Sequence, residues 1–304
     1  MRITLVHNPG AGDDGNPQAA ELQQLIRSAG HEVICVSCEQ EDWTEGLGLD
    51  SDLVAVAGGD GTVGRAAKAL VGRNVPFTAI PMGTANNISR TLGLVEKPVP
   101  ELIASWQHSR SVAFDVGIAR GPWGERYFLE GCGAGLFACT MPEADASATL
   151  EHLPRAEARV AYALQMLRER IDDCAVQALQ LRLDGRELSG EYVLAEAMNM
   201  EYVGPNLYLA PACDLHDGLL DVVLVPAAQR EHLRAYLAEW QNGALWPPHL
   251  PTYRGTRLEM AWTGYEVHID DTVWPDPDAG PTSGADAPIE LSVRRNALRF
   301  LVAQ

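Results

Sequence analysis

The residues of this chain that could do chemistry gather first in a short segment after an apolar run. Residues 55–62 read Ala-Val-Ala-Gly-Gly-Asp-Gly-Thr. Glycines let a main chain approach a ligand closely, and the first N–H groups of a following helix can bind phosphate. Asp60 would repel phosphate unless a metal ion or a proton transfer takes part. The segment therefore predicts phosphoryl chemistry, with an ordinary turn as the alternative.

Two familiar phosphate-binding motifs do not fit this segment. Residues 59–64 satisfy the G-x-G-x-x-G pattern of dinucleotide-binding proteins, which requires an acidic residue about 20 positions later. The stretch 77–82 contains none. No Gly-Lys-Ser/Thr triplet follows the glycines either, so a Walker A loop is excluded.

The first 110 residues alternate apolar runs typical of strands with amphipathic runs typical of helices. Strands are predicted at 3–6, 33–36, 52–57 and 75–80. Helices are predicted from Pro17, capped by Asn16, to Gly30, from the glycine loop to about Gly72, and from Asn87 to Gly93. This alternation predicts an open parallel sheet, in which ligands bind beyond the carboxyl ends of the strands. Three glycine-containing segments, 8–12, 58–62 and 83–87, follow such ends.

After residues 98–100 and a short helix at 102–106, the pattern becomes that of a β protein. Strands are predicted at 112–119, 126–130, 176–183, 192–198, 219–225, 258–262, 267–270 and 289–294. Helices are predicted at 157–171 and 228–241, a hairpin turn at 184–185 and a mobile loop at 275–288. We expect an α/β domain at 1–115 and a β-sandwich domain with inserted helices at 116–304, whose last segment can pack back on the first domain.

The length, composition and net charge of the chain limit the classes of function that it can have. The 304 residues are 46% hydrophobic and 21% charged, which is typical of a folded protein, and the length favours two domains. A net charge of −18 without a basic cluster argues against a nucleic-acid partner. No apolar run approaches the ~18 residues that span a bilayer, and no signal peptide is evident, so we expect a cytoplasmic protein with at most peripheral membrane contact. The six scattered cysteines are expected to be free thiols.

Taken together, the motifs of this chain resemble those of the diacylglycerol kinase catalytic-domain family, especially its bacterial soluble members and, distantly, the sphingosine kinases. The segments that carry the resemblance are 8–12, 58–62, 80–87, 90–93, 210–212 and 217–221. The resemblance implies a Rossmann-like nucleotide-binding domain of the NAD kinase and diacylglycerol kinase type and a β-sandwich lipid-substrate domain. It also implies ATP in the cleft between them and transfer of the γ-phosphoryl group to a lipid hydroxyl. NAD kinases share the glycine loop, but segment 217–221 and the lack of a Thr-Gly-Ser-Thr-Ala sequence favour a lipid kinase.

The resemblance also assigns roles to residues. The nucleotide contacts that it implies are Asn8, Ser37, Gly58, Gly59, Asp60, Gly61, Thr62, Gly83 and Thr84. Asp60 is expected to act at the phosphates through Mg²⁺. Asp217 is expected to bind a structural Mg²⁺ together with main-chain oxygens near Asp214 and Leu219, with a solvated turn as the alternative. His216 is expected to be a surface residue.

The catalytic base implied by the resemblance is Asp270, which aligns with the aspartate of an Asp-Gly-Glu triplet. Two departures from the family pattern leave the activity open: Asp271 and Thr272 follow Asp270, and Val63-Gly64-Arg65 replaces Val-Asn-Glu. The alternatives are a catalytically impaired nucleotide-binding or regulatory protein and a kinase of a small soluble metabolite. The apolar helix at 158–171 is either core or a wall of an acyl-chain pocket. The expected partner is a lipid substrate, and homodimer formation is left open.

Overall fold

The computed structural model describes residues 1–11, 16–243, 248–275 and 288–302. The chain divides into two compact units. Unit 1 comprises Met1–Phe114, Pro154–Glu157 and Asn296–Gln304, and unit 2 comprises Asp115–Leu153 and Ala158–Arg295. Gly12 and most of the loop predicted at 275–288 lie outside the described residues. Among the helices of the described ranges, none has the length and hydrophobicity that crossing a bilayer requires.

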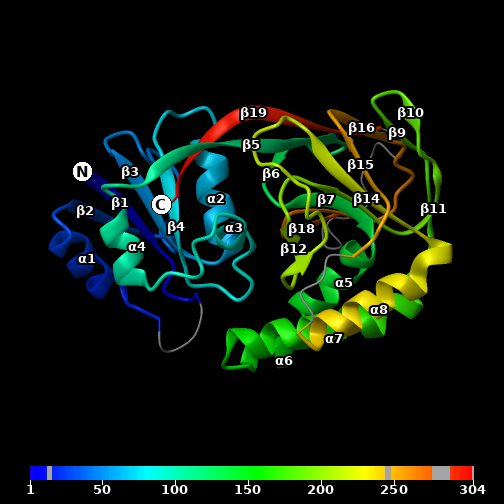
Figure 1. Cartoon of the computed structure of the whole chain (residues 1–304), viewed down its shortest axis with the longest axis horizontal. Helices are drawn as coiled ribbons and strands as arrows, with labels where there is room; N and C mark the ends of the chain where they lie inside the picture. Colours follow the sequence, from blue (N-terminus) through cyan, green and yellow to red (C-terminus); the bar gives the residue numbers. More distant parts are fainter. Residues whose placement is uncertain (12–15, 244–247, 276–287, 303–304) are drawn as a thin grey trace. The chain divides into compact units, whose positions relative to one another are not determined.

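Unit 1 is an open parallel sheet covered by helices, which confirms the predicted α/β class (Figure 1). The sheet has the order β2–β1–β3–β4–β19, and every pairing in it is parallel. Its strands are β1 (Arg2–His7), β2 (Glu32–Ser37), β3 (Leu53–Gly58), β4 (Phe77–Pro81) and the end of β19 (Ile289–Val302). The central strand β3 is buried along its whole length, which explains its continuous apolar sequence.

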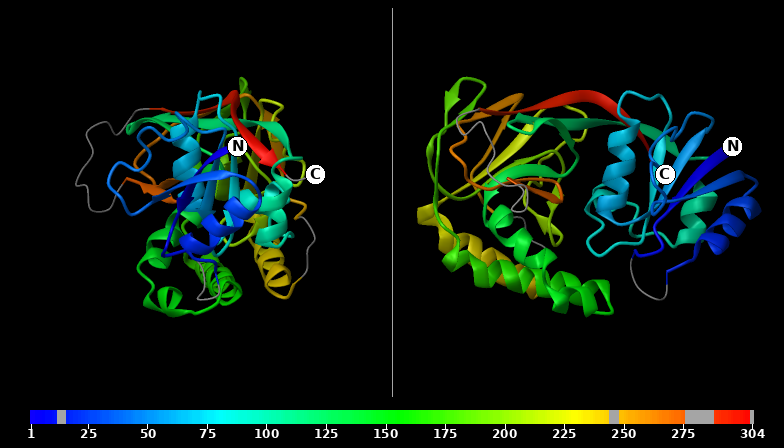
Figure 2. Two further views of the ribbon diagram at one scale, coloured as in Figure 1. Left: turned by 90° about the vertical axis from the view of Figure 1, so that its left-hand side faces the viewer. Right: turned by 180° about the vertical axis from the view of Figure 1, so that it is seen from behind.

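Two pairs of helices cover the two faces of this sheet (Figures 1 and 2). On one face α1 (Ala19–Ser28) packs with α4 (Val99–Ser105), and on the other α2 (Asp60–Leu70) packs with α3 (Asn87–Thr91). The start predicted for α1 was wrong, because Gln18 is the N-cap residue. Asn16 instead donates from Nδ2 to the main-chain oxygen of Met82 (3.1 Å), which ties this loop to the end of β4.

Unit 2 contains two sheets that face each other, which confirms the predicted β-sandwich. The first sheet has the order β6–β5–β19–β16–β9–β10 and the second β15–β14–β11–β7–β17–β18, with β8 beside β11. The additional strands of the first sheet are β5 (Arg110–Gly121), β6 (Gly124–Phe128), β9 (Leu181–Leu183), β10 (Arg186–Glu187) and β16 (Arg257–Met260). Those of the second are β7 (Gly131–Gly135), β8 (Gln177–Leu179), β11 (Gly190–Met198), β14 (Leu220–Pro226), β15 (Thr252–Gly255), β17 (Val267–Ile269) and β18 (Thr272–Trp274).

Two apolar cores hold unit 2 together, one on each face of the second sheet. One fills the space between the sheets and includes Phe128, Leu258 and Val267. The other lies under helices and includes Leu164, Val193 and Leu237. The remaining elements are α5 (Leu136–Asp145), α6 (Ala148–His152), α7 (Ala156–Asp173), η1 (Ala227–Gln229), α8 (Arg230–Gln241) and the pair β12 (Tyr202–Val203) and β13 (Leu207–Tyr208). Helices α7 and α8 lie side by side (Figure 1), joined by hydrogen bonds such as Arg230 to the Asp172 oxygen.

Three elements near the site, β7, α5 and β19, differ from the sequence prediction. Strand β7 and helix α5 were not predicted, since glycines at 131, 133 and 135 and Pro142 are typical of loops. Strand β19 is longer than predicted, because the chain passes through Asn296 in a left-handed conformation (φ 50°) and then continues as a strand. Beyond that residue, Phe300 pairs in parallel with Phe77 of β4.

Candidate functional site

The carboxyl ends of β1, β3 and β4 carry the three glycine-containing segments, as predicted. Because these strands are neighbours in the sheet, residues far apart in sequence come together there. Asn8, directly after β1, donates from Nδ2 to Oγ1 of Thr62 in the first turn of α2 (2.8 Å). The structure thus brings together two of the residues predicted to contact the nucleotide.

The main chains of Gly59 and Gly83 touch. A Cβ atom on Gly59 would lie 2.9 Å from the Cα of Gly83, and one on Gly83 would lie 2.3 Å from the Cα of Gly59. Both distances are too short for any side chain, so this approach requires glycine at both positions. The Asn86 side chain holds the second loop in place by hydrogen bonds to both the N–H and the oxygen of Gly83 (2.8 Å each).

Asp60 joins the two loops through its carboxylate. It is the first residue of α2, and its Oδ1 accepts a hydrogen bond from the main-chain N–H of Ile88 (3.0 Å), with the amides of Asn86 and Asn87 also bonding to the carboxylate. Burial raises the pKa of Asp60, and these amide hydrogen bonds oppose that rise. Asp60 therefore fixes the start of α2 to the start of α3, a role that the sequence did not indicate.

The remaining predicted nucleotide contacts lie at the same edge. Ser37 ends β2 opposite His7 and accepts a hydrogen bond from the N–H of Glu39 (3.3 Å), and Thr84 follows Gly83. His7, which the sequence analysis did not select, is buried at the end of β1, and burial lowers its pKa. Within the described residues its Nε2 atom has no hydrogen-bond partner. The only sequence signal for selecting His7 as a candidate site residue is its position directly before Asn8.

In unit 2, Asp270 lies in the turn that joins β17 to β18. Its backbone is left-handed (φ 49°), and its Oδ1 accepts hydrogen bonds from the N–H groups of Leu129 (3.0 Å) and Glu130 (2.9 Å). Its own N–H donates to the oxygen of Gly131 (2.9 Å). Strand β17 was predicted to include Asp270, but it ends at Ile269, so Asp270 and the exposed Asp271 form the turn. The turn is thereby attached to the start of β7.

Beneath this turn lies a buried ion pair that the sequence analysis missed. Glu196 on β11, Gly133 on β7 and His268 on β17 form one row across three neighbouring strands. Because Gly133 has no side chain, Oε2 of Glu196 reaches Nε2 of His268 (2.8 Å), and a Cβ on Gly133 would lie 2.2 Å from that oxygen. Both charged side chains are almost completely buried. Glycines in β7, which made this strand resemble a loop in the sequence, therefore leave the space that the Glu196 side chain occupies.

His268 connects the pair to Asp270. Its Nδ1 lies 3.0 Å from the main-chain oxygen of Asp270, and because a carbonyl oxygen only accepts, Nδ1 carries a proton. Burial lowers the pKa of His268, but the charge and hydrogen bond of Glu196 outweigh burial and raise that pKa above its usual value. The left-handed turn is thus held by the His268 imidazole and by the main-chain amides of Leu129 and Glu130.

At the predicted magnesium site the structure places an arginine. The Asp217 carboxylate pairs with Arg254, whose Nε also lies 3.3 Å from Oδ1 of the buried Asp221. Asp217 accepts a hydrogen bond from the N–H of Leu219 (2.9 Å), and Asp214 pairs with the exposed His216. Across the described part of the chain, no group of three or more His, Cys, Asp or Glu side chains is arranged to hold a metal. This donor set fits a guanidinium, and a Mg²⁺ shell around Asp217 would require Arg254 to leave.

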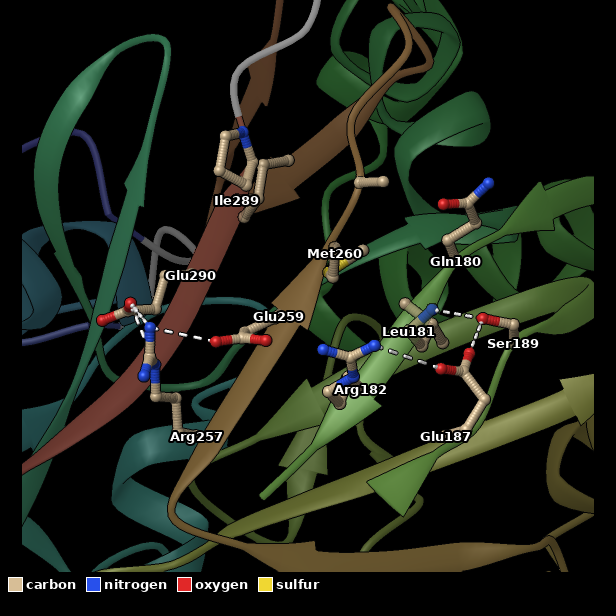
Figure 3. A pocket seen from close by; sticks show the side chains of 12 residues that line it. Gln180, Leu181, Arg182, Glu187, Ser189, Arg257, Glu259, Met260, Ile289 and Glu290 are labelled. Carbon is tan, nitrogen blue, oxygen red and sulfur yellow. Dashed lines mark hydrogen bonds and ion pairs between the residues drawn. The ribbon is translucent and has the colours of Figure 1, made fainter. Parts of the chain in front are cut away.

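The described residues of unit 2 line, among other pockets, two cavities of about 440 Å³ each. The first lies on β9, β10, β16 and β19 and is lined by Leu181, Met260 and ion-paired side chains such as Arg257 and Glu290 (Figure 3). It contains none of the predicted site residues. The second lies beside the Asp270 turn and is lined by two tryptophans in edge contact (5.8 Å between ring centroids), Pro142, Asp145 and Asp271. The lining of the second cavity also includes none of the predicted site residues, but it contains Ile269 and Asp271, the two neighbours of Asp270 in sequence.

The helix considered as a wall of an acyl-chain pocket is part of the core. The buried side chains of α7 include Leu164, Leu167 and Ile171, and they pack with the second sheet and α8. No residue of α7 lines either of the two cavities.

Comparison with known families decides the class of the protein. The model of the diacylglycerol kinase catalytic domain matches residues 2–119, and that of the YegS C-terminal NAD kinase beta sandwich-like domain matches residues 140–302. The chain belongs to the diacylglycerol kinase catalytic-domain family. It is accordingly a phosphotransferase with an alcohol acceptor, as predicted.

Individual members of this family are similar over most of the chain. A diacylglycerol kinase of Mycobacterium tuberculosis is 26% identical over 282 residues, covering 88% of each chain. A Pseudomonas aeruginosa protein named "Probable lipid kinase YegS-like" is 29% identical over 236 residues, covering 75% of this chain and 72% of that protein. The crystal structure of a diacylglycerol kinase from Bacillus anthracis str. Sterne has a TM-score of 0.71 at 20% identity, covering 99% of this chain and 96% of that one, and supports the fold.

Proposed function

We propose that this chain is an ATP-dependent lipid kinase that transfers the γ-phosphoryl group of ATP to a lipid hydroxyl, such as that of diacylglycerol. The observation that carries the proposal is the contact between Gly59 and Gly83 at the carboxyl ends of two parallel strands, in a chain of this family. Two glycine segments without side chains, beside a helix N-terminus, can bind a triphosphate. Phosphate oxygens accept hydrogen bonds from the main-chain N–H groups of such segments.

The ATP side of the reaction would use unit 1. The N–H groups of Gly61 and Thr62 lie in the first turn of α2, where no intrahelical acceptor exists for them. With Gly58, Gly59, Gly83 and Thr84 they would bind the phosphates, and Asn8 would orient the Thr62 hydroxyl. ATP would enter as its Mg²⁺ complex, which neutralises phosphate charge, and Asp60 would keep the two loops in register.

The acceptor side would use unit 2. Asp270 is proposed to take the proton of the lipid hydroxyl, whose oxygen attacks the γ-phosphorus while ADP leaves. The second cavity would hold the acceptor, since Trp123 and Trp274 offer apolar faces and Asp271 an acceptor for hydroxyl groups. The arrangement of donors around Asp270 would orient its carboxylate for this task.

A transfer assay tests the proposal. Purified protein is incubated with γ-labelled ATP and Mg²⁺ together with diacylglycerol, phosphatidylglycerol, ceramide or sphingosine in mixed micelles, with glycerol as the water-soluble comparison. We expect label in one of the lipids. Label in glycerol at higher efficiency than in any lipid would instead support a kinase of a small soluble metabolite.

A second candidate is a nucleotide-binding protein without phosphotransfer to lipid. The observation that favours it is the replacement of the family's Gly-Glu by Asp271 and Thr272, both exposed at the turn. ATP binding by calorimetry without transfer to any acceptor would support this candidate.

We also infer a cytoplasmic location, where both ATP and the inner membrane surface are accessible.

A further inference from the structure

Two cysteine thiols of unit 2 lie in direct contact. The Sγ atoms of Cys139 on α5 and Cys174, directly after α7, are 2.7 Å apart. Both cysteines are free thiols. Cys139 is partly exposed, whereas Cys174 is almost completely buried. Contact between thiols on two different elements places them where a covalent bond needs little movement of either backbone.

The surroundings of the pair favour ionisation of the exposed thiol. The hydrogen bond between Cys139 and Cys174 lowers the pKa of Cys139 to about 7. Thr140 and the Arg170 guanidinium act in the same direction, and burial opposes them. The same hydrogen bond and burial raise the pKa of Cys174. Arg230 binds the main-chain oxygens of Asp172 (3.0 Å) and Cys174 (3.1 Å), which keeps a second guanidinium beside the pair.

The four other cysteines lack these features. Burial raises the pKa of Cys35, of Cys38, of Cys132 and of Cys213 above the usual value. A thiolate is the nucleophile in cysteine chemistry, so these thiols are expected to react slowly. Among the six cysteines, Cys139 is thus the one whose pKa is lowered, and its Sγ atom is in contact with that of Cys174.

We propose that Cys139 and Cys174 form a modification site for hydroperoxides, at which the two thiols are reversibly converted to an intrachain disulfide. Cys139 first loses its thiol proton, and its thiolate attacks one oxygen of hydrogen peroxide. The O–O bond breaks, Cys139 sulfenic acid and hydroxide result, and the hydroxide takes up the released proton to become water. Cys174 then attacks the sulfenic sulfur, the S–S bond forms, and the hydroxide that leaves takes the Cys174 proton. Overall two thiols are oxidised and one peroxide is reduced to two water molecules.

The disulfide would connect α5 to the end of α7. Helix α5 packs against β17 and β18, the two strands that flank the Asp270 turn. A cross-link between positions 139 and 174 also restricts the unfolded chain, and a loop of this size corresponds to a rise of roughly 5–15 °C in Tm. The proposal does not depend on the proposed kinase activity, since each of its consequences can be measured without substrate.

Peptide mass spectrometry tests the proposal on the full chain. Reduced protein is treated with a few equivalents of hydrogen peroxide, blocked with iodoacetamide and digested with trypsin without reduction. We expect peptide 127–155 joined to peptide 171–182 and 2 Da lighter than their sum, with release by dithiothreitol. Because peptide 127–155 also contains Cys132, fragment ions between positions 133 and 138 assign the bond to Cys139.

Variants and alkylation rates complete the test. Cys139→Ser is expected to abolish the linked peptide and the rise in Tm, whereas Cys213→Ser keeps both. In native protein, iodoacetamide is expected to modify Cys139 faster than Cys35, with half of its limiting rate near pH 7, which checks the site even if a variant fails to fold. Linkage through Cys132, oxidation of Cys139 to a sulfinic acid without a disulfide, or alkylation of Cys139 no faster than Cys35 would each overturn the proposal.

Discussion

Nε2 of His268 lies 2.8 Å from Oε2 of Glu196, and both side chains are almost completely excluded from solvent. The glycine between them, Gly133, is the residue that allows the contact across an intervening strand. On its other side the imidazole reaches the main-chain oxygen of Asp270 (3.0 Å). The conformation of the proposed catalytic turn is therefore coupled to the charge on a buried histidine.

This coupling predicts a pH-dependent contribution to stability. Because the pKa of His268 is raised in the folded protein, the folded state binds one more proton than the unfolded state between pH 6.5 and that raised pKa. The contribution is complete below pH 6.5 and is lost as the pH rises through the raised value, with a slope of at most about 1.4 kcal/mol per pH unit. His268→Gln should lower the unfolding free energy most below pH 6.5, by about 3–5 kcal/mol.

Urea unfolding of wild type and His268→Gln between pH 5.5 and 8.5 measures this difference. His7 and His31, whose pKa values burial lowers, and Cys139, whose pKa is lowered by Cys174, give slopes of the opposite sign, but these are common to both proteins. Their effects cancel in the comparison. A free-energy difference that is constant across this pH range would contradict the assignment of a charged His268.

The contact of Gly59 with Gly83 predicts that a single methyl group blocks ATP. Gly83→Ala should displace one of the two loops, cost about 1–3 kcal/mol of stability and weaken ATP binding at least tenfold. Gly64→Ala is the matched control, since a Cβ there meets no heavy atom within 4 Å and helix propensity favours alanine. Calorimetric titration with ATP and thermal unfolding of both variants provide the test. Wild-type affinity in Gly83→Ala would show that ATP binds elsewhere.

Asp270→Asn should separate binding from chemistry. The amide keeps an oxygen to accept from Leu129 or Glu130 but cannot take a proton, so turnover should fall by about 10²–10⁴ while the Kd for ATP stays within twofold. Asp271→Asn, one position along the same turn, should retain most activity. Steady-state kinetics and ATP titration of both variants are the measurements. Full activity of Asp270→Asn would remove this residue from the mechanism.

Arg254→Gln should destabilise unit 2, because it leaves Asp221 buried without its cation. We expect a loss of about 1–3 kcal/mol in unfolding free energy. If Asp214, Asp217 and the Leu219 oxygen can bind Mg²⁺, millimolar Mg²⁺ should restore part of this loss in the variant, and Na⁺ at equal ionic strength should not. Thermal unfolding with each salt measures both effects. Unchanged stability of the variant without Mg²⁺ would contradict the role given to Arg254.

The parts of the fold that were predicted from sequence are those with strong local signals. Strand β3 is a buried apolar run that ends at glycine, and its predicted bounds, 52–57, differ from Leu53–Gly58 by one residue at each end. The hairpin at Asp184 and Gly185 was also predicted correctly, since both residues have positive φ. Strand β7 was missed because its glycines are required by Glu196 on another strand, which no local pattern reveals.

The same distinction applies to the candidate site. Asn8, Gly59, Thr62 and Gly83 could be grouped in advance, because each follows a parallel strand and such strand ends meet at one edge. The pairing of His268 with Glu196 depends on the register of three antiparallel strands. The pairing of Arg254 with Asp217 joins strand β15 to the turn before β14, 37 residues earlier. Neither can be inferred from spacing along the chain.

Strand β19 has a consequence for biosynthesis. The ring of Phe300 packs at a tilt of 45° against that of Phe77 (3.7 Å between ring centroids), and Oγ1 of Thr78 donates to the oxygen of Leu301, a residue 223 positions later. While the chain emerges from a ribosome, the sheet of unit 1 therefore lacks its fifth strand until nearly all of unit 2 has been made. During that interval β4 is an edge strand, so the sheet of unit 1 is completed only after residues 296–302 have been synthesised.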